Sequence, residues 1–292
     1  MWRRIKRMYY NGSPIMIVQL LPTDGEMRMF DVTPLDLLVR PLVLAAAEVY
    51  YKHTRPWFIA LALHGSAYKG GYIPGCSDID FKLFLRGEAL SFYGELPLAI
   101  GQAIQEDLSY INPAPFQYFQ TYILTVEAGG NRPDDWSRPI PGTYHMLAGK
   151  LPAQEMSETE TLEKCRATLK RLPKAISKPA EDMLHHGAGR LERSVRFLCT
   201  NVWPILYSYL SIETGQPFAI WSLPKDKVLA LLPENQAPGR AIRHFHQQVS
   251  SYFSQPHTTR AALQTISAGV HFLQLIDERL RTQPTWTQQK EN

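Results

Sequence analysis

The chain has 292 residues, of which 45% are hydrophobic, enough to bury the core of one large domain or of two modest ones. This composition excludes a largely disordered chain. Lys and Arg total 31 against 27 Asp and Glu, so the formal charge of +4 falls far short of the dense basic stripe of a dedicated nucleic-acid-binding protein. We therefore do not expect nucleic acid as a partner.

The three cysteines, Cys76, Cys165 and Cys199, are too few and too widely spaced for a disulfide framework, and they include no CxxC pair for zinc. This usage fits a reducing cytoplasm. The N-terminus holds only short apolar runs, broken by Asn11 and Pro14, so we expect no signal peptide. Nowhere do about 18 apolar residues run uninterrupted, and we expect no membrane-spanning helix.

The N-terminal segment reads as a small β-meander over residues 1–33. Short β-rich runs alternate there with the dipeptides Asn11-Gly12 and Asp24-Gly25. Both dipeptides favour tight hairpin turns, because their residues accept the positive φ angles that such turns demand.

Residues 34–150 predict an α/β domain. Apolar positions at helical spacing indicate a helix over 35–53, with Pro41 either at a kink or in the first turn. Downstream, the elements alternate between strands and a helix, which implies a mixed sheet. The predicted strands cover 57–63, 80–85 and 116–126, the predicted helix covers 95–109, and the Gly- and Pro-rich stretch 129–157 reads as a loop or linker.

The rest of the chain has few strand signals and predicts a helical domain over 151–292. The expected fold class is therefore α+β, with a mixed-sheet domain followed by an all-α bundle. The helices are expected over 158–175, 181–212, 225–232, 237–253 and 257–282.

The segment 63–83 holds the residues that indicate chemistry. Asp78 and Asp80 lie two positions apart at the start of a predicted strand, so their side chains point to the same face. Ile79 then faces the buried side. Paired carboxylates of this kind suit Mg²⁺, which also holds triphosphate oxygens.

A glycine turn precedes this pair. Gly65 permits close backbone approach, and the amides of the turn together with the Ser66 hydroxyl can hold phosphate oxygens. Taken singly, Gly-Ser is more often an ordinary turn and Asp-Ile-Asp a solvated strand start. Their order, with a glycine-rich stretch between two apolar strands, favours a functional site.

This segment resembles the signature of the polymerase-β nucleotidyltransferase superfamily, in particular its aminoglycoside nucleotidyltransferase-like branch. The motif covers about 20 residues, and an α/β domain followed by a helical domain matches the family plan over most of the chain. The resemblance implies that Gly65 and Ser66 bind a nucleoside triphosphate, with ATP favoured, and that Asp78 and Asp80 bind Mg²⁺. It also implies in-line attack of a substrate hydroxyl on the α-phosphate, with release of pyrophosphate.

The resemblance further implies a third carboxylate, on the strand that follows the intervening helix. The matching position here is Gln120, which cannot take a proton at neutral pH. Glu127 could substitute, but it lies an odd number of residues away and would face the opposite side. Lys82 shares the face of Asp78 and Asp80. It binds phosphate, takes part of the charge role of a missing metal, or is an exposed lysine at the strand end.

A second family-like feature lies in the helical half. The stretch 214–227 resembles the family's glycine turn and lysine-bearing helix start, which implies that Lys225 contacts the triphosphate. The alternative is a capped helix N-terminus, with Ser222 or Asp226 serving the backbone.

One histidine pattern and one arginine pattern have weaker interpretations. His185 and His186 would point about 100° apart on a helix, which favours a surface or packing role over joint metal binding. Arg190, Arg193 and Arg196 form either an anion-binding rim or a solvated face.

Two further features carry little weight. The spacing of Arg240 and His246 matches the ribonuclease motif of certain helical domains that accompany minimal nucleotidyltransferases, but so short a pattern arises easily by chance. Cys76 reads as a small packing residue, because the sequence shows no basic partner for it.

Two functions remain open from the sequence. The first is a Mg²⁺-dependent enzyme that transfers a nucleoside monophosphate to a hydroxyl of a small, aminoglycoside-like molecule, as in antibiotic resistance. The second, favoured by Gln120, is a catalytically impaired protein that binds nucleotide as a sensor, scaffold or toxin–antitoxin component. Transfer onto protein hydroxyls or RNA ends and the formation of a homodimer also stay open.

Overall fold

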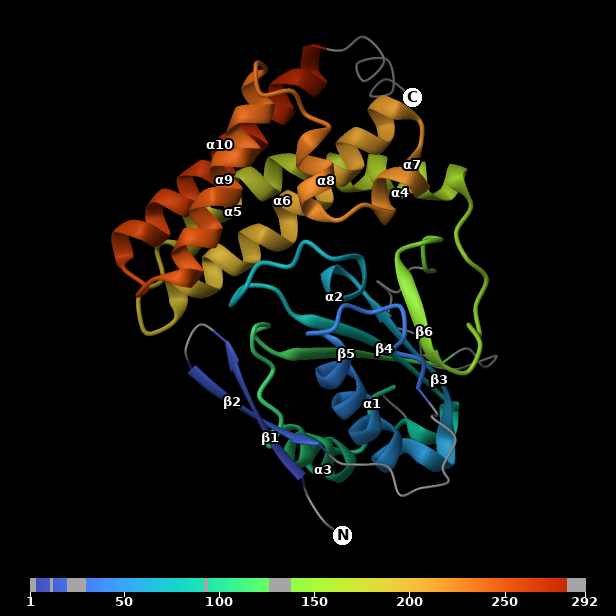
Figure 1. Ribbon diagram of the computed structural model, residues 1–292. Helices are drawn as coiled ribbons and strands as arrows, with labels where there is room; N and C mark the ends of the chain where they lie inside the picture. Colours follow the sequence, from blue (N-terminus) through green and yellow to red (C-terminus); the bar gives the residue numbers. More distant parts are fainter. Residues whose placement is uncertain (1–3, 11–12, 20–29, 92–93, 126–137, 283–292) are drawn as a thin grey trace. The chain divides into compact units, whose positions relative to one another are not determined.

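The computed structural model describes residues 4–10, 13–19, 30–91, 94–125 and 138–282 (Figure 1). The chain divides into two compact units. The first unit comprises Met1–Tyr72 and Ser77–Glu155, and the second comprises Ile73–Cys76 and Met156–Asn292. The short segment 73–76 thus belongs with the second unit, although its neighbours on both sides belong to the first.

A four-stranded mixed sheet forms the centre of the first unit, as the sequence predicts. Strand β4 lies between β3 and β5 (Figure 1), and the strand order is β5-β4-β3-β6. Strand β4 pairs with β3 antiparallel and with β5 parallel. The strands are β3 (Phe58–His64), β4 (Ile79–Leu85), β5 (Phe119–Leu124) and β6 (Tyr144–Ala148).

Strand β6 corrects the prediction that residues 129–157 form only a loop or linker. It pairs antiparallel with β3, so that Tyr144 lies opposite His64. The five-residue strand is flanked by Pro141 and Gly142 on one side and by Gly149 on the other. Because turn residues dominate the local composition, the sequence predicts a loop here. The short strand forms by pairing with residues about 80 positions earlier in the chain.

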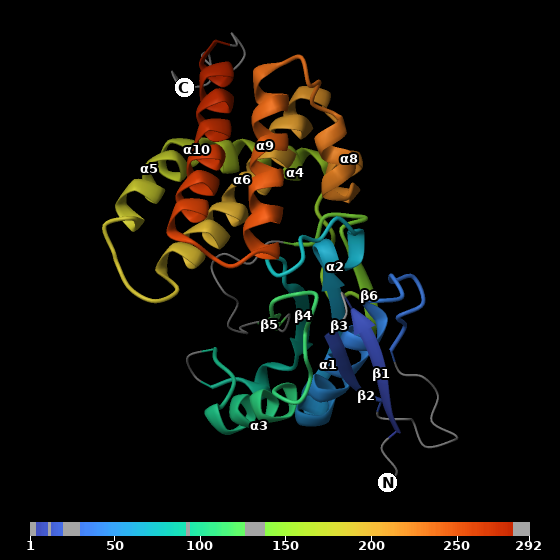
Figure 2. The ribbon, with the colours of Figure 1, turned by 60° about the vertical axis from the view of Figure 1, so that its left-hand side comes forward.

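One face of the sheet is covered by the helix α1 (Arg40–Thr54), against which α3 (Leu98–Leu108) also packs (Figures 1 and 2). Pro41 lies in the first turn of α1, where its missing N–H has no partner to lose. Asp107 of α3 accepts hydrogen bonds from Lys52 (2.6 Å) and pairs with His53 (2.7 Å), which ties the two helices together. Alternate apolar residues of β3 and β4 fill the core beneath: Leu61, Leu63, Ile79, Phe81 and Leu83.

The N-terminal segment contains an antiparallel hairpin of β1 (Arg4–Tyr10) and β2 (Ser13–Gln19). Both predicted turns, at Asn11-Gly12 and at Asp24-Gly25, lie outside the described residues. Three short elements complete the first unit: η1 (Arg55–Trp57), α2 (Ser66–Lys69) and η2 (Gly87–Ala89).

The second unit is helical and is organised around α6, whose buried face includes Val202, Leu206 and Tyr209. Helices α9 and α10 lie side by side (Figure 2), and both α4 and α10 pack on α6. The helices are α4 (Glu158–Lys170), α5 (Leu172–Asp182), α6 (Arg190–Thr214), α7 (Pro217–Ser222), α8 (Lys225–Ala230), α9 (Ala237–Ser254) and α10 (Thr259–Thr282).

Two helix boundaries differ from those predicted. The helix expected over 158–175 breaks after Lys170, because Pro173 falls in the first turn of a new helix, where proline is best accepted. The helix expected over 181–212 begins only at Arg190. Gly189, at φ +71°, precedes it in a left-handed conformation that cannot continue a helix. The short helix α7 was not predicted.

The mixed sheet of the first unit and the helices of the second confirm the predicted α+β class. Within the described residues, every helix is too short or too polar to cross a lipid bilayer.

Tyr50 gives the first unit an expected sensitivity to alkali. The residue is 2% exposed, meets Phe81 edge-on with ring centroids 5.2 Å apart, and burial raises the pKa of its phenol from 10.0 to about 12. Between these two pH values only the unfolded chain releases the proton, so the free energy of unfolding falls as pH rises. We expect a loss of up to about 3 kcal/mol across that window.

Denaturant unfolding of the protein at pH values on either side of 10 measures this effect. Tyr50→Phe removes this ionisable group and should make the alkaline fall in stability less steep, while the raised pKa values of other phenols, such as that of Tyr118, keep part of the fall. An equally steep fall in the variant would show that Tyr50 does not cause it.

Candidate active site

The second face of the sheet carries the polar residues of the predicted motif. In β4 the polar residues that point away from α1 are Asp80 and Lys82, both half-buried, whereas Ile79 and Phe81 are fully buried on the other side. The register places Asp80 opposite His64 of β3 and opposite Gln120 of β5. The pairing therefore brings a histidine, a carboxylate and an amide into one row across three strands.

Gly65 brings the turn into contact with this row. The residue has φ +73° and ψ −154°, a region that is essentially restricted to glycine. A Cβ at this position would lie 2.6 Å from Oδ2 of Asp80, closer than real Cβ contacts allow. The carboxylate of Asp80 and the turn that begins at Ser66 are thus direct neighbours, and glycine is the residue that permits their approach.

Tyr118 lies close to both aspartates, although the sequence did not predict it as a site residue. Partial burial raises the pKa of Tyr118 to about 12, and the negative charge of Asp78, its hydrogen bond with Asp78 and the charge of Asp80 add to the rise. The phenol therefore stays protonated and acts as a hydrogen-bond donor to Asp78. The period-two alternation of Tyr118, Gln120 and Tyr122 in the sequence was the signal that could have found it.

Gln120 occupies the position where the resemblance implies a third carboxylate. Its amide nitrogen donates a hydrogen bond of 2.6 Å to the hydroxyl of Tyr122, two residues further along β5. An amide held in this way offers no proton-accepting group at the site. Glu127, the alternative carboxylate, lies outside the described residues.

Lys82 continues the same face one step beyond Asp80. It lies opposite Ala62 of β3 and Tyr122 of β5 in the strand register. Its role in binding phosphate stays a prediction, as do the roles assigned to Gly65 and Ser66.

The carboxylate oxygens of Asp78 and Asp80 are the type of ligand that Mg²⁺ prefers, although they come from two residues alone. Mg²⁺ prefers oxygen ligands, keeps several waters, and commonly takes one or two carboxylates together with substrate phosphates. Asp78 and Asp80 supply that number. No group of three or more His, Cys, Asp and Glu residues that could hold a metal ion occurs in the described parts of the chain, so any metal here would depend on the nucleotide for further oxygen ligands.

Lys225 lies in the second unit, at the first position of α8, with Nζ 5.7 Å from the centroid of the Trp203 ring. The helix has no side-chain cap, and the hydroxyl of Ser222 instead donates to the carbonyl of Ala219. The predicted alternative, a helix N-terminus capped by Ser222 or Asp226, is therefore wrong. Contact between Lys225 and a nucleotide stays a prediction.

The histidine and arginine patterns are also corrected. His185 and His186 lie in the loop between α5 and α6 rather than on a helix, and they line a small cavity together with His257. Arg190 and Arg193 are exposed, but Arg196 is half-buried and donates hydrogen bonds to backbone carbonyls. The three arginines therefore do not form one continuous anion-binding rim or one solvated face.

The two residues of the Arg240 and His246 pattern have local structural roles. Arg240 donates hydrogen bonds to the carbonyls of Glu234 and Asn235, at the start of α9. His246 packs edge-on against Trp203 with ring centroids 5.7 Å apart, and burial lowers its pKa.

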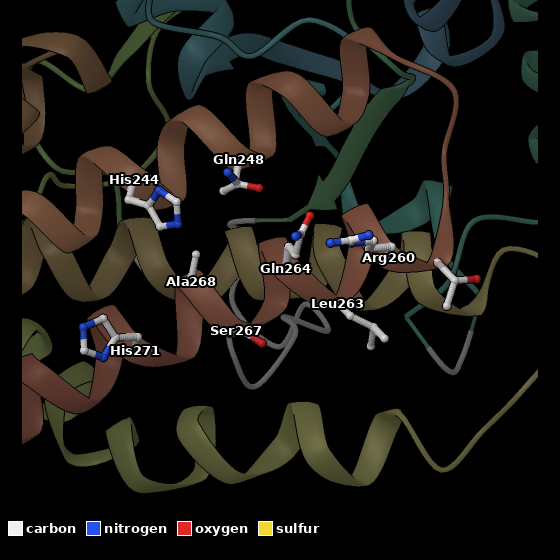
Figure 3. Close-up of a pocket in the computed structure, with 9 residues that line it drawn as sticks. His244, Gln248, Arg260, Leu263, Gln264, Ser267, Ala268 and His271 are labelled. Atoms are coloured by element: carbon white, nitrogen blue, oxygen red, sulfur yellow. The ribbon is translucent and has the colours of Figure 1, made fainter.

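The second unit also has a groove between α9 and α10, with a volume of about 830 Å³ (Figure 3). His244 and Gln248 reach it from α9, and Gln264 and His271 reach it from α10. None of the residues that line it was predicted as part of the site. The groove is shallow, because most of these side chains are solvent-exposed.

Comparison with known proteins identifies no family. No family model matches the chain, and no curated protein sequence matches it. Among solved structures, the chain is similar to spectinomycin adenyltransferase AAD(9) from Enterococcus faecialis, solved with ATP and spectinomycin. That similarity has a TM-score of 0.43 and 15% sequence identity, and it covers 80% of this chain and 98% of the other.

Proposed function

We propose that the protein is a Mg²⁺-dependent nucleotidyltransferase. It transfers a nucleoside monophosphate from a nucleoside triphosphate, with ATP favoured, to a hydroxyl of a small molecule and releases pyrophosphate. The acceptor class, an aminoglycoside-like compound, rests on the sequence resemblance.

One observation carries the proposal: the glycine turn and the aspartate pair are neighbours. A carboxylate oxygen of Asp80 lies 2.6 Å from the position that a Cβ of residue 65 would take, and Asp78 directly precedes β4, the strand that holds Asp80. A phosphate-binding turn beside two metal-binding carboxylates is the arrangement that the transfer of a nucleotidyl group requires.

The reaction joins the acceptor oxygen to the α-phosphorus and breaks the bond from this phosphorus to the α,β-bridging oxygen. Ser66 and the amides of its turn would hold the phosphate oxygens, and Lys82 would offset their negative charge. Asp78 and Asp80 would hold Mg²⁺, which supplies stabilisation of the charge on the entering and leaving oxygens. Tyr118, as a donor to Asp78, would orient that carboxylate.

The second candidate function is nucleotide binding without efficient transfer. The observation that favours it is the hydrogen bond from Gln120 to Tyr122, which occupies the amide at the position of the third carboxylate. Without a base there, the acceptor proton must pass to solvent, and transfer would be slow.

A transfer assay separates the two functions. The protein is incubated with Mg²⁺, α-labelled triphosphates and a panel of aminoglycoside-like acceptors, and label transfer and pyrophosphate are both measured. Transfer with stoichiometric pyrophosphate supports the enzyme. Magnesium-dependent binding without either product supports the sensor or scaffold, and the absence of nucleotide binding contradicts both.

Gln120→Glu tests the position of the missing base. A carboxylate at residue 120, opposite Asp80 in the register, is expected to raise the rate of transfer at least about tenfold, because a positioned general base contributes roughly 10²–10⁴-fold. Tyr122→Phe is the matched control, since it removes the hydrogen-bond partner of Gln120 and adds no base. An unchanged or lower rate in Gln120→Glu would place the base elsewhere.

A further inference from the structure

The segment Ile73–Cys76 is anchored inside the second unit by its own contacts. Ile73 is 2% exposed and joins the hydrophobic core around α6. Arg196 of α6 donates hydrogen bonds to the carbonyl oxygens of Gly75 (2.8 Å) and Cys76 (3.1 Å). Both the side chain at one end of the segment and the backbone at the other are therefore held.

Arg196 is itself fixed from two sides. Its guanidinium pairs with Glu192 at 2.9 Å and lies over the ring of Phe253, 4.4 Å from the centroid. Glu192 in turn contacts Nδ1 of His257 at 3.2 Å. An arginine that is held in this way keeps the segment that ends at Cys76 in one position relative to α6.

This anchoring brings two cysteine side chains together. The sulfur atoms of Cys76 and Cys199 lie 3.8 Å apart, and neither residue is part of a disulfide. Cys199 lies on α6 and is 7% exposed, whereas Cys76 is half-buried. The third cysteine, Cys165, is buried elsewhere and accepts a hydrogen bond of 3.4 Å from the indole of Trp221.

We propose that Cys76 and Cys199 form a reversible disulfide when the protein meets a peroxide, and that this bond changes the activity of the site that includes Asp78, two residues later in the chain. The formation of the bond is independent of the proposed function, whereas its effect on activity rests on that function. A disulfide requires a sulfur–sulfur bond of about 2.05 Å, a small approach from the observed contact.

The chemistry balances with hydrogen peroxide as the oxidant. The Cys76 thiolate attacks one peroxide oxygen, the O–O bond breaks, and the products are a sulfenic acid and hydroxide. The sulfur of Cys199 then displaces the sulfenic oxygen, which leaves as water after taking up the thiol proton. In sum, two thiols and one peroxide give one disulfide and two waters, so the two sulfurs lose two electrons and the peroxide gains them.

The order of these steps follows from exposure and acidity. The hydrogen bond with Cys76 and burial both raise the pKa of Cys199 well above its usual value, so this residue stays a thiol. Cys76 is the more exposed of the two, and it is the one that an oxidant reaches first. Cys199 is then the resolving residue.

The proposed effect on the site follows from the position of Cys76 in the chain, two residues before Asp78. Drawing the two sulfurs together from 3.8 Å pulls on the backbone that leads into β4. A displacement of about 1 Å at a catalytic group can lower a rate by up to about a hundredfold. We expect the oxidised protein to transfer nucleotide between about tenfold and a hundredfold more slowly than the reduced protein.

The bond itself is tested by mass spectrometry of the full chain after treatment with hydrogen peroxide. We expect a loss of two hydrogens, a cross-linked peptide that joins Cys76 to Cys199, and full reversal by dithiothreitol. Cys165→Ser should retain the cross-link, and Cys199→Ser should lose it. A bridge that includes Cys165, a bridge between two chains, or oxidation of Cys76 without a bridge would overturn the proposal.

The regulatory part has its own readout. Transfer by the native protein should fall on oxidation and recover on reduction, whereas Cys199→Ser should keep its rate in peroxide. An unchanged rate in fully bridged protein overturns this part. If the reduced protein neither binds nor transfers nucleotide, both the proposed function and the regulatory part are overturned. The mass measurement still decides whether the disulfide forms.

Discussion

Asp80→Asn is expected to abolish magnesium-dependent nucleotide binding and to leave the fold intact. The side chain lies half-buried near the start of the interior strand β4, beside Gly65, and its amide replacement fills the same volume. The change removes one negative charge and one of the two carboxylates that the described residues contribute to the site. Mutation of the residues that merely support metal ligands costs about 10–100-fold in metal affinity, so loss of a ligand should cost at least about 100-fold.

Calorimetric titration of a non-hydrolysable triphosphate, with and without Mg²⁺, measures this loss. Asp31→Asn is the matched control: Asp31 is an exposed aspartate of the same unit that accepts hydrogen bonds from Thr33 at 3.0 and 2.6 Å, and an asparagine oxygen can still accept them. The control should bind as the native protein does. Unchanged magnesium-dependent binding by Asp80→Asn, with a normal circular dichroism spectrum, would remove this residue from the site.

Gly65→Ala is the second change with a large expected effect. The added methyl group would meet Oδ2 of Asp80 at 2.6 Å, and the backbone at φ +73° and ψ −154° is strained for any residue with a Cβ. Such strain costs about 1–3 kcal/mol. We expect this loss of stability together with a fall of at least about tenfold in nucleotide affinity, since the carboxylate must move away from the turn.

Gly101→Ala is the control for this substitution. Gly101 lies within α3, and an added Cβ would meet no atom within 4 Å. Alanine in the interior of a helix is favoured over glycine by about 0.5–1 kcal/mol, so this variant should be slightly more stable and should bind nucleotide normally. If both variants behaved alike, the contact between residue 65 and Asp80 would not matter for binding.

The sequence predicted the centre of the first unit because several local patterns agreed there. Two apolar strands, a glycine turn and a period-two aspartate pair each indicated the same arrangement. The fixed alternation of strand side chains then assigned Asp80 and Lys82 to one face without any tertiary information.

What the sequence could not predict depends on distant partners. Strand β6 forms because Tyr144 and its neighbours pair with β3, and no local signal identifies that partner. The contact of Tyr118 with Asp78 depends on a parallel register that is set only when β5 joins the sheet. The distance of 3.8 Å between the sulfurs of Cys76 and Cys199 joins residues 123 positions apart.

Local breakers explain the errors in the helical half. Apolar residues recur at helical spacing across Arg171 and across 183–189. A prediction based on this spacing alone therefore extends one helix through each of these positions. The chain breaks them at Pro173 and at Gly189, where backbone constraints outweigh the pattern. The assignment of 73–76 to the second unit, with Ile73 in its core, likewise has no signature within a glycine-rich stretch.

A crystal structure of the protein with Mg²⁺ and a non-hydrolysable ATP analogue tests the central claim most directly. We expect a cation held by Asp78 and Asp80 and by oxygens of the triphosphate, with the phosphate chain against the turn of Gly65 and Ser66. A nucleotide bound at another place, or a triphosphate at the turn whose cation touches neither aspartate, would contradict the account.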